Sequence, residues 1–226
     1  MLIVDDEKEI RDLIAIYLEN EGFEVTTCTG AEDALESMEQ QEVELAILDV
    51  MMPDMDGFAL LREIRRKWFF PVIMLTAKVQ DVDKLTGLSL GADDYITKPF
   101  NPLELVARVK TQIRRNVKYN RAGDRIDDGK IVIRGLSVDE LSHKCTLNGE
   151  TLSLTPTEFR ILLYLCKNQG KVVSSEDLFE HVWGEKYYES SNTVMAHIAR
   201  LRTKMHEPSR RPEYIKTVWG VGYTIE

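Results

Sequence analysis

The chain has 226 residues, of which 30% are charged and 43% are hydrophobic, and its formal net charge is −9 at pH 7. This length suits two domains that each bury a core, and the composition is that of an ordinary globular protein rather than a disordered one. The three cysteines lack metal-ligand spacing, no signal peptide is recognisable, and no apolar run approaches the roughly twenty residues of a membrane span, so we expect a cytoplasmic protein with reduced thiols and no membrane partner.

The acidic side chains are concentrated in the first half of the chain. Residues 1–115 hold 23 of the 38 acidic residues but only 13 of the 29 basic ones, whereas residues 116–226 are nearly neutral. Such a difference favours two modules that have different partners.

The first half alternates short apolar runs with helical patterns. The apolar runs, each short enough for a buried parallel strand, are Leu2–Val4, Phe23–Thr27, Leu45–Leu48, Pro71–Leu75 and Tyr95–Thr97. Between and after them, apolar residues recur at the spacing of one helix face, as at Leu103, Val106 and Val109. This alternation predicts an α/β domain over residues 1–115, with a doubly wound, five-stranded parallel sheet.

The second half begins with a polar segment and continues with a different pattern. Residues 116–130 carry glycine at two turn positions and predict a linker. The strands expected next are Ile131–Arg134, Lys144–Leu147 and Thr151–Leu154, the helices begin at Thr155, Ser174 and Ser191, and the final hairpin is formed by Tyr214–Trp219 and Tyr223–Glu226. Three helices followed by a hairpin predict an α+β winged helix-turn-helix domain over residues 131–226.

Carboxylates follow two of the apolar runs of the first half. Asp5 and Asp6 come directly after the first run, and Asp49 comes directly after the third. Because the carboxyl ends of parallel strands share one edge of the sheet, we expect these side chains to converge there and to bind Mg²⁺. Asp49 could then accept a phosphoryl group, with the main-chain carbonyl of Met51 completing the metal shell.

Two further side chains suit a phosphoryl site at the same edge. Thr76 ends the fourth apolar run and Lys98 follows the fifth, which places a hydroxyl to sense the phosphoryl group and a cation to hold it. Taken singly, each residue has a plainer explanation, such as an acidic helix N-terminus for Asp5 and Asp6. The occurrence of the whole set at one edge, in this order, favours the phosphoryl site.

Four segments of the first half resemble the receiver domain of two-component response regulators. They are Val4–Glu7, Asp49–Gly57, Leu75–Ala77 and Gly91–Phe100. The resemblance implies that a sensor histidine kinase phosphorylates Asp49, that Asp6 binds Mg²⁺ directly and Asp5 through water, and that the chain is a regulator rather than an enzyme. It also implies that Thr76 and Tyr95 form a switch pair, which turns inward when the phosphoryl group arrives.

The resemblance extends to a charged dimer surface. The residues that match it are Lys84, Asp93, Asp94, Glu104 and Arg108. They imply a homodimer that forms on phosphorylation, with Lys84–Glu104 and Asp94–Arg108 pairs across a two-fold axis. Mixed charge on a helix is otherwise simply a solvated face.

Three segments of the second half resemble the winged-helix effector domain of the OmpR/PhoB class. They are Leu152–Phe159, Val194–Arg202 and Ile215–Tyr223. A helical wheel assigns Val194, Ile198 and Leu201 to the core and predicts that the opposite face enters the major groove of promoter DNA. The DNA-binding residues expected on the helix and wing are Asn192, Ala196, His197, Arg200, Arg202, Lys204, Lys216 and Thr217. In this class, the loop at Gly184–Ser190 meets RNA polymerase.

We therefore expect a phosphorylation-activated transcriptional regulator. One alternative is a phosphorylation-independent DNA-binding protein, against which the complete acidic site argues. Another is an Asp-based, Mg²⁺-dependent phosphatase, which would need a second aspartate where Met51 stands. Within the family, Phe69–Thr76, Asp94–Glu104 and Tyr214–Tyr223 look most like regulators of glycopeptide (vancomycin) resistance, whose relatives control other envelope-stress responses.

Overall fold

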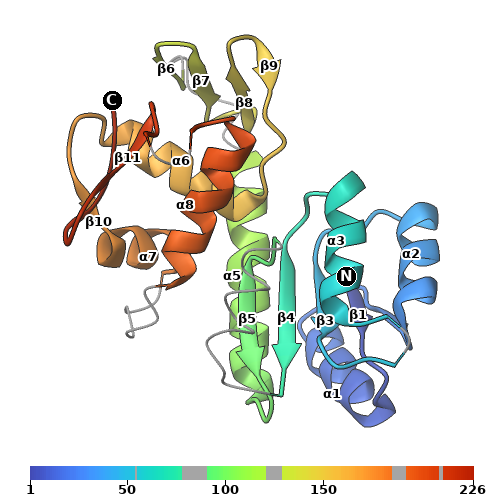
Figure 1. The fold of residues 1–226 in the computed structure, drawn as a ribbon. Helices are drawn as coiled ribbons and strands as arrows, with labels where there is room; N and C mark the ends of the chain where they lie inside the picture. The colour runs from blue at the N-terminus through green and yellow to red at the C-terminus, as the bar shows by residue number, and fades with distance from the viewer. Residues whose placement is uncertain (54, 78–90, 121–128, 185–191, 209–210) are drawn as a thin grey trace. The chain divides into compact units, whose positions relative to one another are not determined.

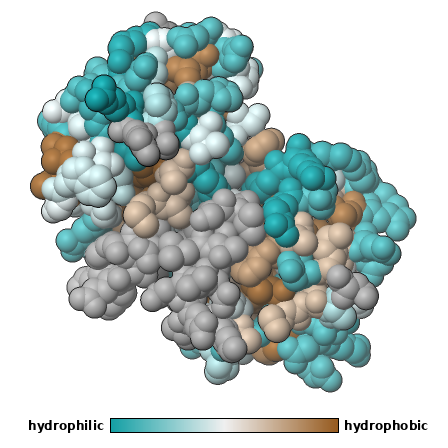
Figure 2. Space-filling model, in the orientation of Figure 1, coloured by the Kyte–Doolittle hydropathy of each residue, from teal (hydrophilic) through white to brown (hydrophobic). Residues whose placement is uncertain are grey.

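The computed structural model describes residues 1–53, 55–77, 91–120, 129–184, 192–208 and 211–226, and leaves out the side chains of residues 114–120 and 192. The chain divides into two compact units, Met1–Arg114 and Arg115–Glu226. On the face drawn in Figure 2, hydrophilic residues predominate among those that are coloured, and apolar residues gather in patches. Among the described helices, none has the length and apolar character needed to cross a bilayer.

The first unit is built on a five-stranded sheet in the order β2-β1-β3-β4-β5 (Figure 1). Its strands are β1 (Leu2–Val4), β2 (Thr26–Cys28), β3 (Ala46–Asp49), β4 (Val72–Thr76) and β5 (Asp94–Thr97). All neighbouring strands of this sheet run parallel, and β1, β3 and β4 are buried along their whole length. The predicted α/β fold with a five-stranded parallel sheet is confirmed.

Helices cover both faces of this sheet. They are α1 (Lys8–Glu19), α2 (Ala31–Gln40), α3 (Gly57–Lys67) and α5 (Pro102–Asn120). One core joins Ile3 and Ile47 of the sheet to α1 and α5, and a second core joins Val4 and Leu48 to α2 and α3. Because successive strand residues point to opposite faces, uniformly apolar strands can supply both cores. The expected helix between β4 and β5 falls on residues 78–90, outside the described part of the chain.

In the first unit, two boundaries differ by three residues or more from the sequence-based expectation. Strand β2 begins at Thr26 rather than at Phe23, because its partner β1 begins only at Leu2, which pairs with Thr26. Helix α5 continues to Asn120, into the segment 116–130 that was expected to be a linker. That segment contains no glycine or proline before Gly123, so nothing in its first residues stops a helix. The exact domain boundaries stay a prediction.

The second unit begins with a four-stranded antiparallel sheet. Its strands are β6 (Lys130–Ile133), β7 (Leu136–Asp139), β8 (Lys144–Leu147) and β9 (Glu150–Thr151). Asn148-Gly149 forms the hairpin turn between β8 and β9, and both residues have positive φ, as a tight turn of this kind requires. Strand β7 was not anticipated, because only Leu136 and Val138 alternate as buried residues in it, which is too short a pattern to stand out.

Helices and a second sheet complete this unit. The elements are α6 (Pro156–Lys167), β10 (Val173–Ser174), α7 (Ser175–Trp183), α8 (Asn192–Lys204), β11 (Ile215–Val218) and β12 (Gly222–Ile225), with the strands in the order β10-β12-β11. Helices α6 and α7 begin where the sequence predicted: Thr155 and Glu158 form a capping box at α6, and the Ser174 side chain accepts a hydrogen bond from the backbone of α7. The expected succession of helices and a closing hairpin is confirmed.

The three cysteines are buried, Cys28 in the first unit and Cys145 and Cys166 in the core of the second. Burial raises the pKa of Cys28 above its ordinary value and raises the pKa of Cys145 and of Cys166 to about 12. Since the thiolate is the reactive form, these thiols are inert in the folded chain.

Candidate functional site

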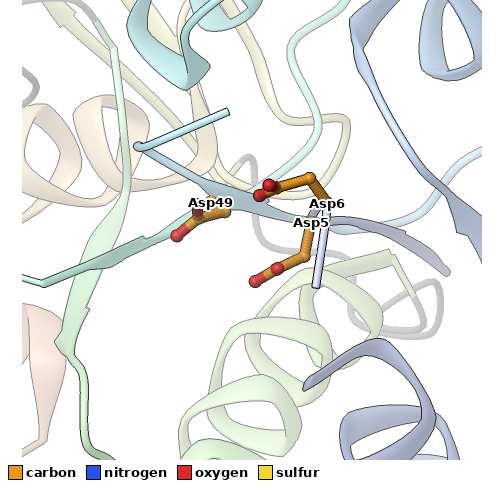
Figure 3. Close-up of side chains that lie close together, drawn as sticks. All are labelled: Asp5, Asp6 and Asp49. Carbon is orange, nitrogen blue, oxygen red and sulfur yellow. The ribbon is translucent and has the colours of Figure 1, made fainter. Parts of the chain in front are cut away.

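Three carboxylates converge at the carboxyl edge of the parallel sheet (Figure 3). Asp5 and Asp6 follow β1, and Asp49 is the last residue of the neighbouring strand β3. One oxygen from each carboxylate lies within 4.8 Å of the other two. Asp5 and Asp49 are buried, whereas Asp6 is exposed. The structure therefore brings the predicted acidic residues together, with one of them open to solvent.

Lys98 joins this cluster from the end of β5. Its Nζ lies 2.8 Å from Oδ2 of Asp5 and 2.9 Å from Oδ1 of Asp49. The backbone N–H of Lys98 donates to the carbonyl of Thr76 at 2.7 Å, which fixes the start of the segment that carries the ammonium group. One cation is thus shared between two buried carboxylates.

The electrostatics of the cluster oppose the charge on Asp49. Burial raises the pKa of Asp49, and the charge of Asp5 raises it further; Lys98 and the N–H of Met51, 3.0 Å from Oδ2, act in the opposite direction without cancelling the shift. Burial lowers the pKa of Lys98, but its bonds to Asp5 and Asp49 outweigh that effect, so its pKa lies above the ordinary value. Lys98 therefore stays charged, but its single positive charge does not balance the carboxylates around it.

The donor set fits a hard divalent cation. Three carboxylates carry three negative charges and Lys98 carries one positive charge, so two negative charges are left for a cation to offset. Carboxylate oxygens are the ligands that Mg²⁺ prefers, and Mg²⁺ usually keeps several waters, which the exposed side chain of Asp6 allows. The participation of the main-chain carbonyl of Met51 stays a prediction.

The two residues expected to form a switch pair share one face of the sheet. Thr76 is buried at the end of β4. Tyr95 is on β5, where it pairs with Met74 of β4. Tyr95 is half-buried and packs against the core under α2 and α3, with its hydroxyl oxygen enclosed. Thr76 lies two residues along β4 from Met74, so both side chains are directed to the same face. This placement is compatible with the predicted pair but does not test the switch.

One residue of the expected dimer surface is instead part of the interior. Asp93 is fully buried and accepts hydrogen bonds from Arg65 Nη2 at 2.9 Å and from the N–H of Val72 at 3.0 Å. The sequence pattern of adjacent aspartates could not distinguish the inward residue from the outward one. Asp93 therefore connects α3 to the sheet rather than facing a partner.

The remaining residues of that surface pair within the chain. Arg108 lies 3.1 Å from Asp94 and 3.0 Å from Glu104, all on β5 or α5. The expectation placed the Asp94–Arg108 pair between two subunits, whereas here both partners belong to one chain. Lys84 lies outside the described residues.

The buried face of α8 includes Val194, Ile198 and Leu201, as the helical wheel predicted, but it is broader than expected. Ala196 is 7% exposed and His197 is fully buried, with its ring 5.4 Å from that of Trp183 on α7. The expectation that both contact DNA is therefore wrong for the structure described. Neither histidine nor alanine gives a clear signal in the apolar periodicity of a helix. The packing of α8 on α6 and α7 therefore decides whether these two residues are buried. The side chain of Asn192 is outside the described part.

The cations expected to meet DNA all have partners within the chain. Arg200 and Lys204 lie 3.2 and 2.6 Å from the carboxylate of Glu158. Arg202 donates to the carbonyl of Ile215 and to the hydroxyl of Thr217 on the wing strand β11. Lys216 pairs with Glu226.

Exposed apolar residues of the helix and hairpin were missed as candidates. Met195 is 51% exposed on α8, and Trp219 and Val221 are 90% and 56% exposed at the turn between β11 and β12. The sequence did contain a signal for this exposure, namely a tryptophan beside Gly220 at the tip of a predicted hairpin. An apolar side chain at a hairpin tip lies too far from the core to be buried there.

Two family models match the chain. Response regulator receiver domain matches residues 1–110, and Transcriptional regulatory protein, C terminal, matches residues 149–225. The chain is 58% identical to Regulatory protein VanRc of Enterococcus gallinarum and 52% identical to Regulatory protein VanR of Enterococcus faecium, with 100% of this chain and 98% of each relative covered.

Solved structures agree with these matches. The response regulator DrrB, a Thermotoga maritima OmpR/PhoB homolog, is 36% identical with a TM-score of 0.52, over 99% of this chain and 97% of that one. A RitR mutant is 26% identical with a TM-score of 0.78, over 100% of this chain and 97% of that one.

Proposed function

Since this chain belongs to the two-component response regulators that join a receiver domain to an OmpR/PhoB-type DNA-binding domain, we propose that phosphorylation of Asp49 controls its binding to promoter DNA. The observation that carries the proposal is the position of Asp49, at the end of β3 beside Asp5, Asp6 and Lys98. A buried carboxylate with a cation at its oxygen and two more carboxylates beside it is suited to phosphoryl transfer.

The chemistry proposed is an in-line displacement. A carboxylate oxygen of Asp49 attacks the phosphorus of a phosphohistidine on the sensor kinase, the new O–P bond forms as the P–N bond breaks, and the imidazole leaves. Asp5, Asp6, Asp49 and the carbonyl of Met51 would hold Mg²⁺, which would screen the negative charge of the incoming group. Lys98 would then pair with a phosphoryl oxygen, and the hydroxyl of Thr76 would donate to another.

The signal would pass from Thr76 and Tyr95 to a homodimer. The surface proposed for this dimer consists of Lys84, Asp94, Glu104 and Arg108. The Arg108–Glu104 pair supports the proposal, because Glu104 is 51% exposed and an exposed carboxylate can be exchanged for one of a partner subunit at little cost. Asp93 is left out because it is buried.

The dimer would bind promoter DNA through α8 and the β11–β12 hairpin, and the segment Gly184–Ser190 would meet RNA polymerase. The chain would act in the cytoplasm as a regulator rather than as an enzyme. Its identity of 58% and 52% to VanRc and VanR supports glycopeptide-resistance genes as the regulon.

Acetyl phosphate with Mg²⁺ provides the direct test. Intact mass should show one phosphoryl adduct on the wild type and none on Asp49→Ala, whereas Asp12→Ala, which removes an exposed aspartate of α1, should behave as the wild type does. Size exclusion of the same samples should show dimers only where the adduct forms. An unmodified wild type, or an adduct that persists in Asp49→Ala, would overturn the proposal.

A further inference from the structure

Glu158 is a fully buried carboxylate at the start of α6. Its Oε2 accepts a hydrogen bond of 2.9 Å from the backbone N–H of Thr155, which is half of the capping box. A cap of this kind needs only an acceptor oxygen, because Gln serves at this position as well as Glu. The negative charge of Glu158 is therefore not explained by the cap.

Two cations of α8 meet that charge. Arg200 Nη1 lies 3.2 Å from Oε1, and Lys204 Nζ lies 2.6 Å from Oε2 and 2.7 Å from the carbonyl of Ser153. The Arg200 side chain is 14% exposed and that of Lys204 is 29% exposed. A buried carboxylate needs such partners, since an unpaired one would be strongly unfavourable away from water.

The ion pair of Lys216, on the wing strand β11, differs from the pairs at Glu158 in its exposure. Lys216 pairs with Glu226, but both of those side chains are about half exposed, at 44% and 54%. An exposed pair is weak and can be exchanged for another anion. The pairs at Glu158 are shielded from water and are held on the same side of α8 by one residue of α6.

We propose that Glu158 is the internal counterion of α8, a positioning residue that keeps Arg200 and Lys204 away from DNA phosphates and fixes the rotation of the helix. The proposal rests on the DNA-binding function proposed above. Arg202 supplies a second tether, to Ile215 and Thr217 of β11. With the helix tied to α6 on one side and to the wing on the other, the stripe left exposed on its described residues is Met195, Ala199 and Thr203, spaced four residues apart.

The salt dependence of DNA binding separates this role from a merely structural one. Each cation that contacts a phosphate adds about 0.9 to the slope of log K against log salt on duplex DNA. A cation neutralised inside the protein adds nothing. The slope therefore shows whether Arg200 and Lys204 contact DNA phosphates. It does not depend on how much of the protein is folded, because only folded molecules bind in this way.

The experiment uses the full-length chain, phosphorylated with acetyl phosphate and Mg²⁺, and a fluorescently labelled duplex of random sequence, titrated by anisotropy at several salt concentrations. Arg200→Met and Lys204→Met are each expected to leave the slope unchanged within about 0.3, well under the value for one phosphate contact. Lys144→Met, which removes an exposed cation on β8, is the control for the loss of one positive charge. A loss of about 0.9 per subunit in either α8 variant, but not in the control, would overturn the proposal.

Glu158→Gln supplies the complementary test, because it keeps the cap oxygen and removes only the charge. The freed cations can then turn to phosphates, so the slope should become steeper by about 0.9 for each one that does. An unchanged slope in a folded Glu158→Gln protein would contradict the proposal, and if this variant does not fold, the two single variants decide. Absence of duplex binding by the phosphorylated wild type at low salt would overturn the proposed function itself. A slope that falls when Arg200 or Lys204 is removed from the phosphorylated protein would overturn only the role of Glu158.

Discussion

The carboxyl group of Asp49 lies in surroundings that oppose its charge unless a cation is present. Burial and the neighbouring Asp5 raise its pKa, and Lys98 compensates only in part because it is shared with Asp5. The sequence predicted which residues meet at this edge, since strand order and side-chain chemistry are local patterns. It could not predict that Lys98 would bridge two of the carboxylates, because that contact joins residues 93 positions apart.

Asp49→Asn should stabilise the first unit in the absence of divalent cations. A raised pKa means that the folded chain binds the proton more tightly than the unfolded chain, so wild-type stability falls as the pH rises from the ordinary carboxyl pKa through the folded one. The stability of Asp49→Asn does not fall in this way, because the asparagine side chain does not ionise. A gain on the order of 1 kcal/mol would raise the melting temperature by roughly 4 °C.

Thermal unfolding by circular dichroism, in chelator at a series of pH values, checks this prediction. The difference between the two proteins should shrink towards acid pH, where the wild-type carboxyl is protonated. A variant that melts below the wild type at neutral pH would contradict the expectation.

Met51→Asn should shorten the lifetime of the phosphorylated form. Met51 is 70% exposed two residues after Asp49, and its thioether is a poor partner for an attacking water. An amide in its place can orient that water, so we expect dephosphorylation that is several-fold faster. The decay of the phosphoryl adduct, followed by intact mass, measures the rate. Met51→Leu should decay as the wild type does, and an unchanged rate in the Asn variant would refute the idea.

Contacts between elements decided the points that sequence patterns left open. The capping box at Thr155 and the Asn148-Gly149 turn were predictable because each depends on residues within four positions. The burial of His197 was not, because the packing of α8 against α7 sets it. Strand β7 exists because β6 and β8 lie on either side of it, and its own residues only weakly indicate a strand.

Asp93→Ala should destabilise the first unit far more than Asp94→Ala. Asp93 is buried and pairs with Arg65, whose side chain is only 10% exposed, so its removal leaves a cation with little solvent and costs about 3 kcal/mol or more. Asp94 and its partner Arg108 retain some solvent contact, at 12% and 20% exposed, and Arg108 keeps Glu104. Urea unfolding of the two variants compares the neighbours directly. Equal losses would mean that Asp93 does not have the structural role described here.

At the scale of the whole molecule, the two units differ in charge. The first unit is acidic and carries the cluster of Asp5, Asp6 and Asp49, whereas the second is nearly neutral and has its α8 cations paired internally. The composition predicted this division, and the fold of each unit followed from its motifs. The pairing of cations with Glu158 could not be predicted, because it joins residues 42 and 46 positions apart.

Dimerisation of the phosphorylated chain should weaken with salt. The charges proposed for the interface lie near the surface, where ions screen pairs beyond about 10 Å at 0.1 M salt. Light scattering after size exclusion, at low and high salt, should show a shift from dimer towards monomer, and Arg108→Ala should show little dimer at either concentration. Lys110→Ala, which breaks an exposed pair with Glu21, is the matched control. A dimer that is unaffected by Arg108→Ala would place the interface elsewhere.

The buried cysteines allow the opening of each unit to be followed by the reaction of its own thiols. Cys28 reacts only when the first unit opens, and Cys145 and Cys166 react only when the second unit opens, because their thiols are enclosed and resist ionisation in the folded chain. Alkylation followed by peptide mass therefore reports two opening rates from one unlabelled sample. Whether a phosphoryl group on the first unit slows or speeds the opening of the second can be read from the native chain, without an engineered probe.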